Sequence, residues 1–167
     1  HESCADFAFG LMLSLARNIA YGDRQIRAGT WKMFDQIPYV GTDVHEATLG
    51  IIGMGLIGTA VARRATPFNL KIIYNSRTRK PEVEESLGAE WRPDMDSIFK
   101  EADFVSLHMP LTADTEYMVR SRELDLMKTT AFLINTTRGR TVDPKALYAA
   151  VAGESIAGAA IDVTDPE

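Results

Sequence analysis

A glycine-rich segment at positions 53–58 is the feature that most constrains how this 167-residue chain can fold. It reads Gly-Met-Gly-Leu-Ile-Gly and directly follows the apolar run 48–52. The first glycine of such a spacing permits a tight turn, and the third lets a helix and a strand pack closely. Since positions 56–68 carry a helical pattern, the segment predicts a strand, a tight turn and a helix in immediate succession.

Short apolar runs then alternate with helical patterns along the rest of the chain. The predicted strands lie at 48–52, 71–74, 89–91, 103–107, 131–134 and 156–161. Helices are predicted at 56–68, at 82–87, and from Pro144 to Val151 behind an Asp143 cap. This alternation predicts an α/β fold, a Rossmann-type doubly wound parallel sheet with helices on both faces and right-handed crossovers. We expect a single domain over 1–167 with its Rossmann core at 48–161.

The first 31 residues are expected to mediate contacts between domains or subunits. Alanine, leucine and methionine dominate 2–28, which predicts one helix ending near Gly29, followed by an irregular stretch over 30–46. The first half of this helix is apolar nearly all round, so we expect it to be buried against a neighbouring domain or subunit. The apolar run 7–15 is too short to span a membrane and no basic stretch precedes it, so we expect no membrane segment.

Composition narrows the class of protein further. A net charge of −5 argues against a nucleic-acid partner. A single cysteine, Cys4, leaves no intrachain disulfide and no thiolate metal cluster, and it fits a cytoplasmic protein; we expect no metal. Because the chain starts at His1 rather than Met and stops abruptly at Pro166-Glu167, we expect it to be part of a longer protein.

The glycine segment also suggests a ligand. Ligands of such sheets lie beyond the carboxyl ends of the strands, where Gly55 would let a pyrophosphate approach the backbone and the following helix would present its free N–H groups. Glycines mark ordinary strand-to-helix turns as well. The strand before Gly53, the helix after Gly58 and the further strands downstream favour a dinucleotide.

The turn after the second strand bears on which dinucleotide binds. Positions 75–81 read Asn-Ser-Arg-Thr-Arg-Lys-Pro, and no acid appears before Glu82. A carboxylate there would hold the ribose 2′-hydroxyl of NAD, whereas an arginine can bind a 2′-phosphate with two hydrogen bonds. Ser76, Arg77 and Thr78 therefore favour NADP(H), with NAD(H) as the alternative; a solvated basic turn is the other interpretation.

Several motifs in order along the chain carry a family resemblance. They are Gly53–Gly58, 27–31, 108–112, 135–139, and Asp162-Val163 followed by Pro166-Glu167. The chain resembles the D-isomer-specific 2-hydroxyacid dehydrogenases along its whole length. Within them it is most similar to the glyoxylate/hydroxypyruvate reductase branch, because 76–80 is similar to the NADP-type turn of that branch.

The resemblance implies roles near the end of the chain. Arg138 would bind the carboxylate of a 2-keto acid and polarise its carbonyl, for which a permanent planar cation is suited. Glu167 would orient a histidine and favour its protonated form, so that the histidine can protonate the alkoxide. Asp162 would accept a hydrogen bond from the nicotinamide carboxamide. The alternatives are a surface cation for Arg138, a solvated carboxylate for Glu167 and a helix cap for Asp162.

The resemblance also implies a set of cofactor contacts. Backbone groups would cover the pyrophosphate at Leu56 and Ile57, and the cofactor cleft would be lined by Met109, Pro110 and Thr115. Further contacts are implied at Thr136, Thr137 and Arg138.

None of the three histidines is assigned to acid/base catalysis. His108 follows the fourth strand, but in the family the catalytic histidine lies in a proline-histidine segment further along, so a structural or cofactor-adjacent role is favoured for His108. His1 and His45 have no supporting context. We therefore expect the chain alone to have no reductase activity.

The resemblance implies an enzyme that reduces a small 2-keto acid, such as glyoxylate or hydroxypyruvate, to the D-2-hydroxy acid by hydride transfer from NADPH. Two alternatives stay open: a cofactor-sensing module such as a transcriptional co-repressor, and a formate- or phosphite-oxidising relative. In the family the opening helix helps to build a two-fold dimer, so we expect a homodimer.

Overall fold

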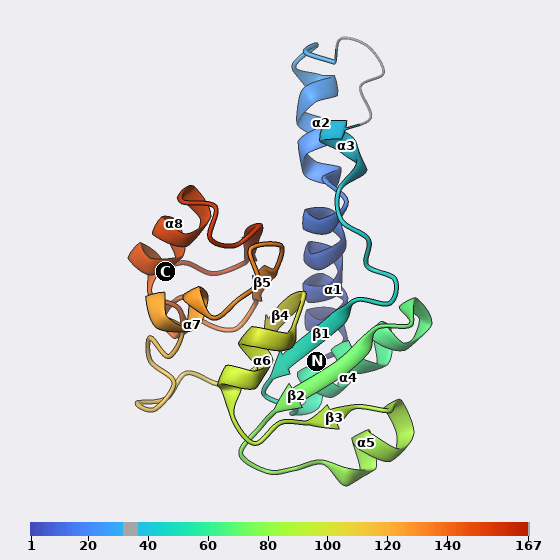
Figure 1. Cartoon of the computed structure of the whole chain (residues 1–167), viewed down its shortest axis with the longest axis vertical. Helices are drawn as coiled ribbons and strands as arrows, with labels where there is room; N and C mark the ends of the chain where they lie inside the picture. Colours follow the sequence, from blue (N-terminus) through green and yellow to red (C-terminus); the bar gives the residue numbers. More distant parts are fainter. Residues whose placement is uncertain (32–36, 167) are drawn as a thin grey trace.

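The computed structural model of the protein describes residues 1–31 and 37–166. Over these residues it confirms the predicted α/β fold, with six parallel strands in a single sheet of order β3-β2-β1-β4-β5-β6 (Figure 1). The strands are β1 (Thr48–Ile52), β2 (Lys71–Asn75), β3 (Glu90–Trp91), β4 (Phe104–Leu107), β5 (Phe132–Asn135) and β6 (Gly158–Ile161). The order reverses between β1 and β4, which divides the sheet into two halves.

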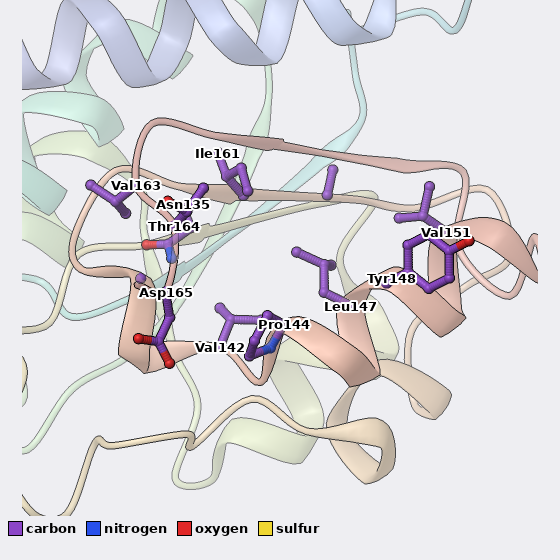
Figure 2. A pocket seen from close by; sticks show the side chains of 12 residues that line it. Asn135, Val142, Pro144, Leu147, Tyr148, Val151, Ile161, Val163, Thr164 and Asp165 are labelled. Carbon is purple, nitrogen blue, oxygen red and sulfur yellow. The ribbon is translucent and has the colours of Figure 1, made fainter. Parts of the chain in front are cut away.

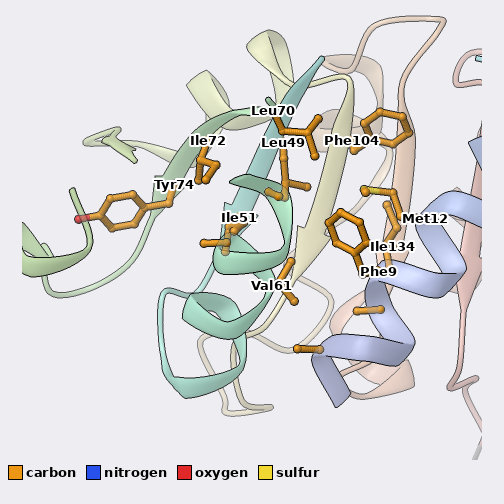
Figure 3. Packing of buried hydrophobic residues seen from close by; sticks show 14 of the residues in the cluster. Phe9, Met12, Leu49, Ile51, Val61, Leu70, Ile72, Tyr74, Phe104 and Ile134 are labelled. Carbon is orange, nitrogen blue, oxygen red and sulfur yellow. The ribbon is translucent and has the colours of Figure 1, made fainter. Parts of the chain in front are cut away.

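Helices cover both faces of the sheet because successive strand residues point to opposite sides. In β1, Ile51 belongs to a core cluster with side chains of α1, α4 and α5, whereas Ile52 belongs to a second cluster with α6, α7 and α8. Figure 3 shows the first cluster, in which Phe9 and Met12 of α1 approach Ile134. The helices of the two layers are α1 (Glu2–Ala16), α4 (Leu56–Ala65), α5 (Pro81–Leu87), α6 (Met95–Glu101), α7 (Ser121–Asp125) and α8 (Pro144–Ala152).

The predicted strands are confirmed, with small shifts of their bounds. The largest shift is at β6, which begins at Gly158 rather than at 156. The helix predicted over 56–68 ends at Ala65 and continues as the 3-10 turn Thr66–Phe68. The predicted Asp143 cap is confirmed, since its Oδ1 accepts the N–H groups of Lys145 at 2.9 Å and Ala146 at 3.2 Å. Helices α6 and α7 have no counterpart among the predicted elements.

The prediction of one helix over 2–28 is wrong. Helix α1 ends at Ala16 and α2 (Ile19–Arg27) follows, because Asn18 adopts a left-handed conformation with φ of 54°. The break lies where the chain returns toward the sheet: Thr42 donates its N–H to the Ala16 carbonyl at 2.7 Å, and Gly41 packs so closely there that a side chain would overlap this carbonyl. The released carbonyl of α1 is thus satisfied by a distant segment.

Helix α1 is buried on one side, where it packs against the sheet of this chain; its buried residues are Ala5, Ala8, Phe9, Met12 and Ala16. Its outer side leaves Phe7 47% exposed. The expected contact with a neighbouring domain or subunit stays a prediction.

Helix α2 extends beyond the sheet together with the short helix α3 (Ile37–Val40) (Figure 1). Helix α3 lies within the stretch 30–46 that was predicted to be irregular. No residue of α2 is buried, and Ile19 and Ile26 are each 58% exposed. The ring of Tyr39 lies 5.7 Å from that of Tyr21, measured between centroids. Across residues 1–31 and 37–166, no helix combines the length and the apolar character needed to cross a bilayer.

Candidate cofactor-binding site

A cavity of about 350 Å³ opens beyond the carboxyl ends of β1, β2 and β4, where the order of the strands reverses. This is the position at which open α/β sheets bind their ligands. The glycine loop contributes Gly53 and Gly55. The rest of the lining is Ile52, Met54, Asn75, Ser76, Arg77, Thr78, Lys80, Met95, His108, Met109, Pro110, Thr112, Asp114, Thr115 and Met118.

Two glycines of the loop are required by close backbone contacts. Gly53 has φ of 99°, and a Cβ there would lie 2.8 Å from the His108 carbonyl carbon and from the Met109 nitrogen. A Cβ on Gly58 would overlap the carbonyl oxygen of Gly53. The first and third glycines therefore let the loop pack against the β4 exit and let α4 pack against the loop.

Gly55 has the opposite surroundings, which suit a ligand. It lines the cavity as the N-cap of α4, and a Cβ there would meet no atom within 4 Å. Leu56 begins the helix with 74% of its surface exposed. The backbone is thus open at the end of a helix whose first N–H groups lack intrahelical partners, so this loop fits a dinucleotide pyrophosphate.

The turn after β2 brings two cations to the cavity. Arg77 and Lys80 both line it, together with the predicted Ser76 and Thr78. Within the described part of the chain, Arg77 makes no ion pair or hydrogen bond. The lining also includes an acid, Asp114, which belongs to the loop after β4 rather than to the end of β2.

The third cation of the turn, Arg79, is absent from this lining. Its guanidinium binds the Glu84 carboxylate, with Nη2 2.7 Å from Oε2, and lies 5.6 Å from the ring centroid of Trp91. These hydrogen bonds from Arg79, with a further one from Tyr74, lower the pKa of Glu84 to about 2. Burial, followed by the hydrogen bond to Glu84, raises the pKa of Tyr74 to about 12.

The loop after β4 forms the opposite wall of the cavity. The predicted Met109, Pro110 and Thr115 all line it. Thr115 ties the loop together, since its Oγ1 donates to the Pro110 carbonyl at 2.7 Å and accepts the Thr112 N–H at 2.7 Å. His108 lines the cavity as well.

His108 is held as a neutral ring. Its Nε2 forms a hydrogen bond with Ser106 Oγ at 2.8 Å, and its Nδ1 is buried without a hydrogen-bond partner in the described structure. Burial lowers the pKa of His108 to about 4. At neutral pH the ring is therefore neutral and does not carry the extra proton of an imidazolium acid.

The β5 exit places Arg138 at the same edge of the sheet but outside the cavity. Its side chain is exposed, and Nη1 donates to the Thr137 carbonyl at 2.7 Å. The buried Asn135 shapes this exit, because its Oδ1 accepts from the N–H of Thr137 at 3.0 Å and its Nδ2 donates to the Arg138 carbonyl at 3.1 Å. Thr136 and Thr137 are partly exposed beside it.

The β6 exit lies against the β5 exit. Asp162 is exposed, and its N–H donates to the Asn135 carbonyl at 3.0 Å. Gly139 packs so tightly against Thr164 that a Cβ would overlap the Thr164 carbonyl. The Tyr117 hydroxyl donates to Asp165, which connects this exit to the loop that follows β4.

A second cavity, of about 380 Å³, lies between α8 and β6. Figure 2 shows Leu147, Tyr148 and Val151 of α8 on one side and Ile161 of β6 on the other. Tyr148 is 77% exposed. The described residues that line this second cavity are mainly apolar and include no Lys or Arg, so the cavity does not resemble a site for a phosphate or a carboxylate.

The structure thus separates the predicted site residues into groups. One group lines the 350 Å³ cavity: Gly53, Gly55, Ser76, Arg77, Thr78, Met109, Pro110 and Thr115. Others lie at the same sheet edge outside this lining: Leu56, Ile57, Gly58, Thr136, Thr137, Arg138 and Asp162. Glu167 lies outside the described residues.

Lys80 and Met95 are among several lining residues that were not predicted from the sequence. Lys80 belongs to the basic turn and its charge was visible there, whereas Met95 comes from the unpredicted helix α6. In the described residues, no group of three or more His, Cys, Asp or Glu side chains could hold a metal ion.

A parallel sheet of this order with a glycine loop at its switch point defines a dinucleotide-binding domain. The sequence profile of the D-isomer specific 2-hydroxyacid dehydrogenase NAD binding domain matches residues 9–167. The chain therefore belongs to the D-isomer specific 2-hydroxyacid dehydrogenase family, as the motifs predicted.

Individual relatives agree with this assignment. A glyoxylate reductase of Thermococcus litoralis is 48% identical over 99% of this chain and 51% of its own length. The TT0316 protein of Thermus thermophilus superimposes with a TM-score of 0.92 at 42% identity, over 99% of this chain and 51% of that protein. A Granulicella formate dehydrogenase superimposes with a TM-score of 0.94 at 29% identity, over 99% of this chain and 44% of that protein. The chain spans about half the length of these relatives.

Proposed function

We propose that the protein to which this chain belongs reduces a small 2-keto acid, such as glyoxylate or hydroxypyruvate, to the D-2-hydroxy acid with NADPH. The observation that carries this proposal is that a glycine-loop cavity and an exposed arginine, Arg138, share one edge of the sheet. The similarity to glyoxylate reductases supports the choice of substrate class.

The preference for NADPH rests on the turn after β2. Arg77 and Lys80 offer positive charge to the cavity where an NAD-binding domain usually carries a carboxylate, so a 2′-phosphate would be attracted rather than repelled. Ser76 and Thr78 add hydroxyls that can donate to phosphate oxygens. NAD(H) is the alternative cofactor.

The glycine loop and the loop after β4 would hold the rest of the cofactor. The pyrophosphate would lie over Gly55 against the N–H groups of Leu56 and Ile57, with Gly58 keeping the helix close. Met109, Pro110 and Thr115 would line the cleft, and Thr136 and Thr137 would contact the cofactor from the β5 exit.

The reacting groups follow from charge and position. The bound nicotinamide would supply the hydride. Arg138 would bind the substrate carboxylate and polarise the keto group, since its side chain is exposed and, among the described residues, its guanidinium donates only to the Thr137 carbonyl. Asp162 would accept a hydrogen bond from the carboxamide, and Glu167 would orient an acid/base histidine supplied by the remainder of the protein.

The remaining proposals concern the whole protein. The rest of the polypeptide would supply a substrate domain next to the core 48–161, and the first 31 residues would mediate contacts between domains or subunits. The exposed apolar side chains of this region, Phe7, Ile19 and Ile26, suit a homodimer contact. We propose a cytoplasmic location.

Steady-state assays of the intact parent test the proposal. We expect turnover of glyoxylate or hydroxypyruvate, with a higher kcat/KM for NADPH than for NADH. Oxidation of formate without reduction of a 2-keto acid would contradict it in favour of the chemistry named for the Granulicella relative. Tight NADPH binding without turnover of any of these acids would favour a cofactor-sensing module.

A further inference from the structure

The turn after β2 carries three cations, Arg77, Arg79 and Lys80, and their surroundings differ. Arg77 and Lys80 line the cavity, whereas Arg79 does not. The guanidinium of Arg79 donates to both carboxylate oxygens of Glu84, from Nε to Oε1 at 2.8 Å and from Nη2 to Oε2 at 2.7 Å. It also lies over the Trp91 ring. One cation of the turn is therefore bound to a carboxylate and does not line the cavity.

Tyr74 connects this ion pair to the backbone of the turn. Its side chain is buried, and its hydroxyl donates to Glu84 Oε1 at 2.7 Å while accepting the Lys80 N–H at 2.7 Å. Lys80 directly precedes α5, so the phenol fixes the point where the turn enters the helix. In Figure 3 the Tyr74 ring extends from β2 away from the other labelled side chains. At the other end of the turn, Ser76 Oγ donates to the Thr78 carbonyl at 2.6 Å.

We propose that Tyr74 and Glu84 are positioning residues that set the cofactor selectivity of this domain. They keep Arg79 out of the cavity and fix the turn, so that Arg77 and Lys80 form a site for a 2′-phosphate before the ligand arrives. This inference rests on the proposed NADP(H) preference. A preformed site avoids the entropy cost of ordering its side chains on binding, and neither Tyr74 nor Glu84 lines the cavity. Substitution of Tyr74 or Glu84 should therefore weaken the binding of NADPH, which carries the 2′-phosphate, and leave the binding of NADH unchanged.

The test is a titration of the intact parent with NADPH and with NADH. For Tyr74→Phe we expect the Kd of NADPH to rise roughly three- to tenfold, the cost of hydrogen bonds lost behind the site, while the Kd of NADH is unchanged. Glu84→Gln keeps an acceptor for the Tyr74 hydroxyl but loses the ion pair to Arg79, so we expect a smaller shift in the same direction. Matched controls are Tyr148→Phe on α8 and Glu85→Gln on α5, both exposed, which should leave both Kd values unchanged.

The possible outcomes distinguish a failure of the positioning role of Tyr74 and Glu84 from a failure of the proposed NADP(H) preference. A wild-type protein that does not prefer NADPH overturns the proposed preference and the positioning role together. A wild-type preference for NADPH that both variants retain overturns the positioning role alone. Equal weakening of the two cofactors also overturns it, because a merely structural role would produce that result. Thermal unfolding of each variant is recorded, and Glu84→Gln decides the question if Tyr74→Phe does not fold.

Discussion

Identical side chains two positions apart in this chain have different neighbours. Arg77 is exposed, lines the cavity and makes no ion pair within the described residues, whereas Arg79 is bound to Glu84 and lies over Trp91. A guanidinium already bound to a carboxylate has fewer donors left for a phosphate. The two arginines should therefore contribute unequally to cofactor binding.

Arg77→Ala tests the exposed arginine directly. We expect the Kd of NADPH to rise about 5- to 150-fold, the equivalent of roughly 1–3 kcal/mol for a charge-assisted hydrogen bond, with little change for NADH. Isothermal titration of the intact parent measures both values. Arg24→Ala, at an exposed position on α2, is the control. A Kd for NADPH that stays the same in Arg77→Ala would remove this residue from the phosphate site.

The glycine loop could be predicted from the sequence because the spacing of its glycines is typical of a strand-to-helix turn in which each position has little room for a side chain or must stay open to a ligand. Gly53 and Gly58 meet close backbone contacts, and Gly55 faces open space. The binding of Arg79 by Glu84, outside the cavity lining, could not be predicted. It depends on Glu84, which one turn of α5 brings back toward β2, and on Trp91 from a strand of only two residues.

At the scale of elements, helix starts depend on a few side chains. Asp143 caps α8 with two hydrogen bonds from backbone N–H groups, and Pro144 occupies the first helical position. Helix α8 packs on the sheet beside β6 through Ala146 and Ala150. A weakened start of α8 should therefore lower the stability of this half of the sheet.

Asp143→Ala should lower the free energy of unfolding by roughly 0.5–2 kcal/mol, the usual cost of losing a helix cap. Urea denaturation of the chain measures the change. Asp143→Asn retains an oxygen acceptor and should retain most of the stability. Asp125→Ala, at the exposed end of α7, is the matched control without a cap. Equal stability of Asp143→Ala and the wild type would show that backbone or solvent groups replace the cap.

Strands β1, β2, β4 and β5 could be predicted because each is a short apolar run with mostly buried residues, and this pattern is local. The break between α1 and α2 could not, because helix propensity alone does not reveal the left-handed Asn18. The break instead coincides with a contact between distant segments, in which Thr42 donates its N–H to the Ala16 carbonyl and Gly41 packs against that carbonyl.

At the scale of the whole molecule, the surroundings of the histidines bear on whether this chain alone could act as the proposed enzyme. His108 lines the cavity, but burial lowers its pKa to about 4, so the ring is neutral near pH 7. His45 lies on the surface, where it bonds Asn69 at 3.0 Å.

We therefore expect purified 1–167 to bind NADPH without reducing glyoxylate. Cofactor binding is measured by fluorescence titration, and turnover by the loss of NADPH absorbance. The intact parent serves as the positive control under the same conditions. Measurable turnover by the chain alone would contradict the expectation and would direct attention to His108.

The reversal of strand order between β1 and β4 also bears on how the molecule folds. β1 pairs with β2, and β4 with β5, after one crossover each, whereas the pairing of Leu49 with Phe104 joins residues far more distant along the chain. Closing longer chain segments costs more entropy, so this central pairing should form late. The cavity takes its lining from both sides of that pairing, and a dinucleotide therefore binds only after the two halves have joined. Such a ligand would slow the unfolding of the finished domain without hastening its folding.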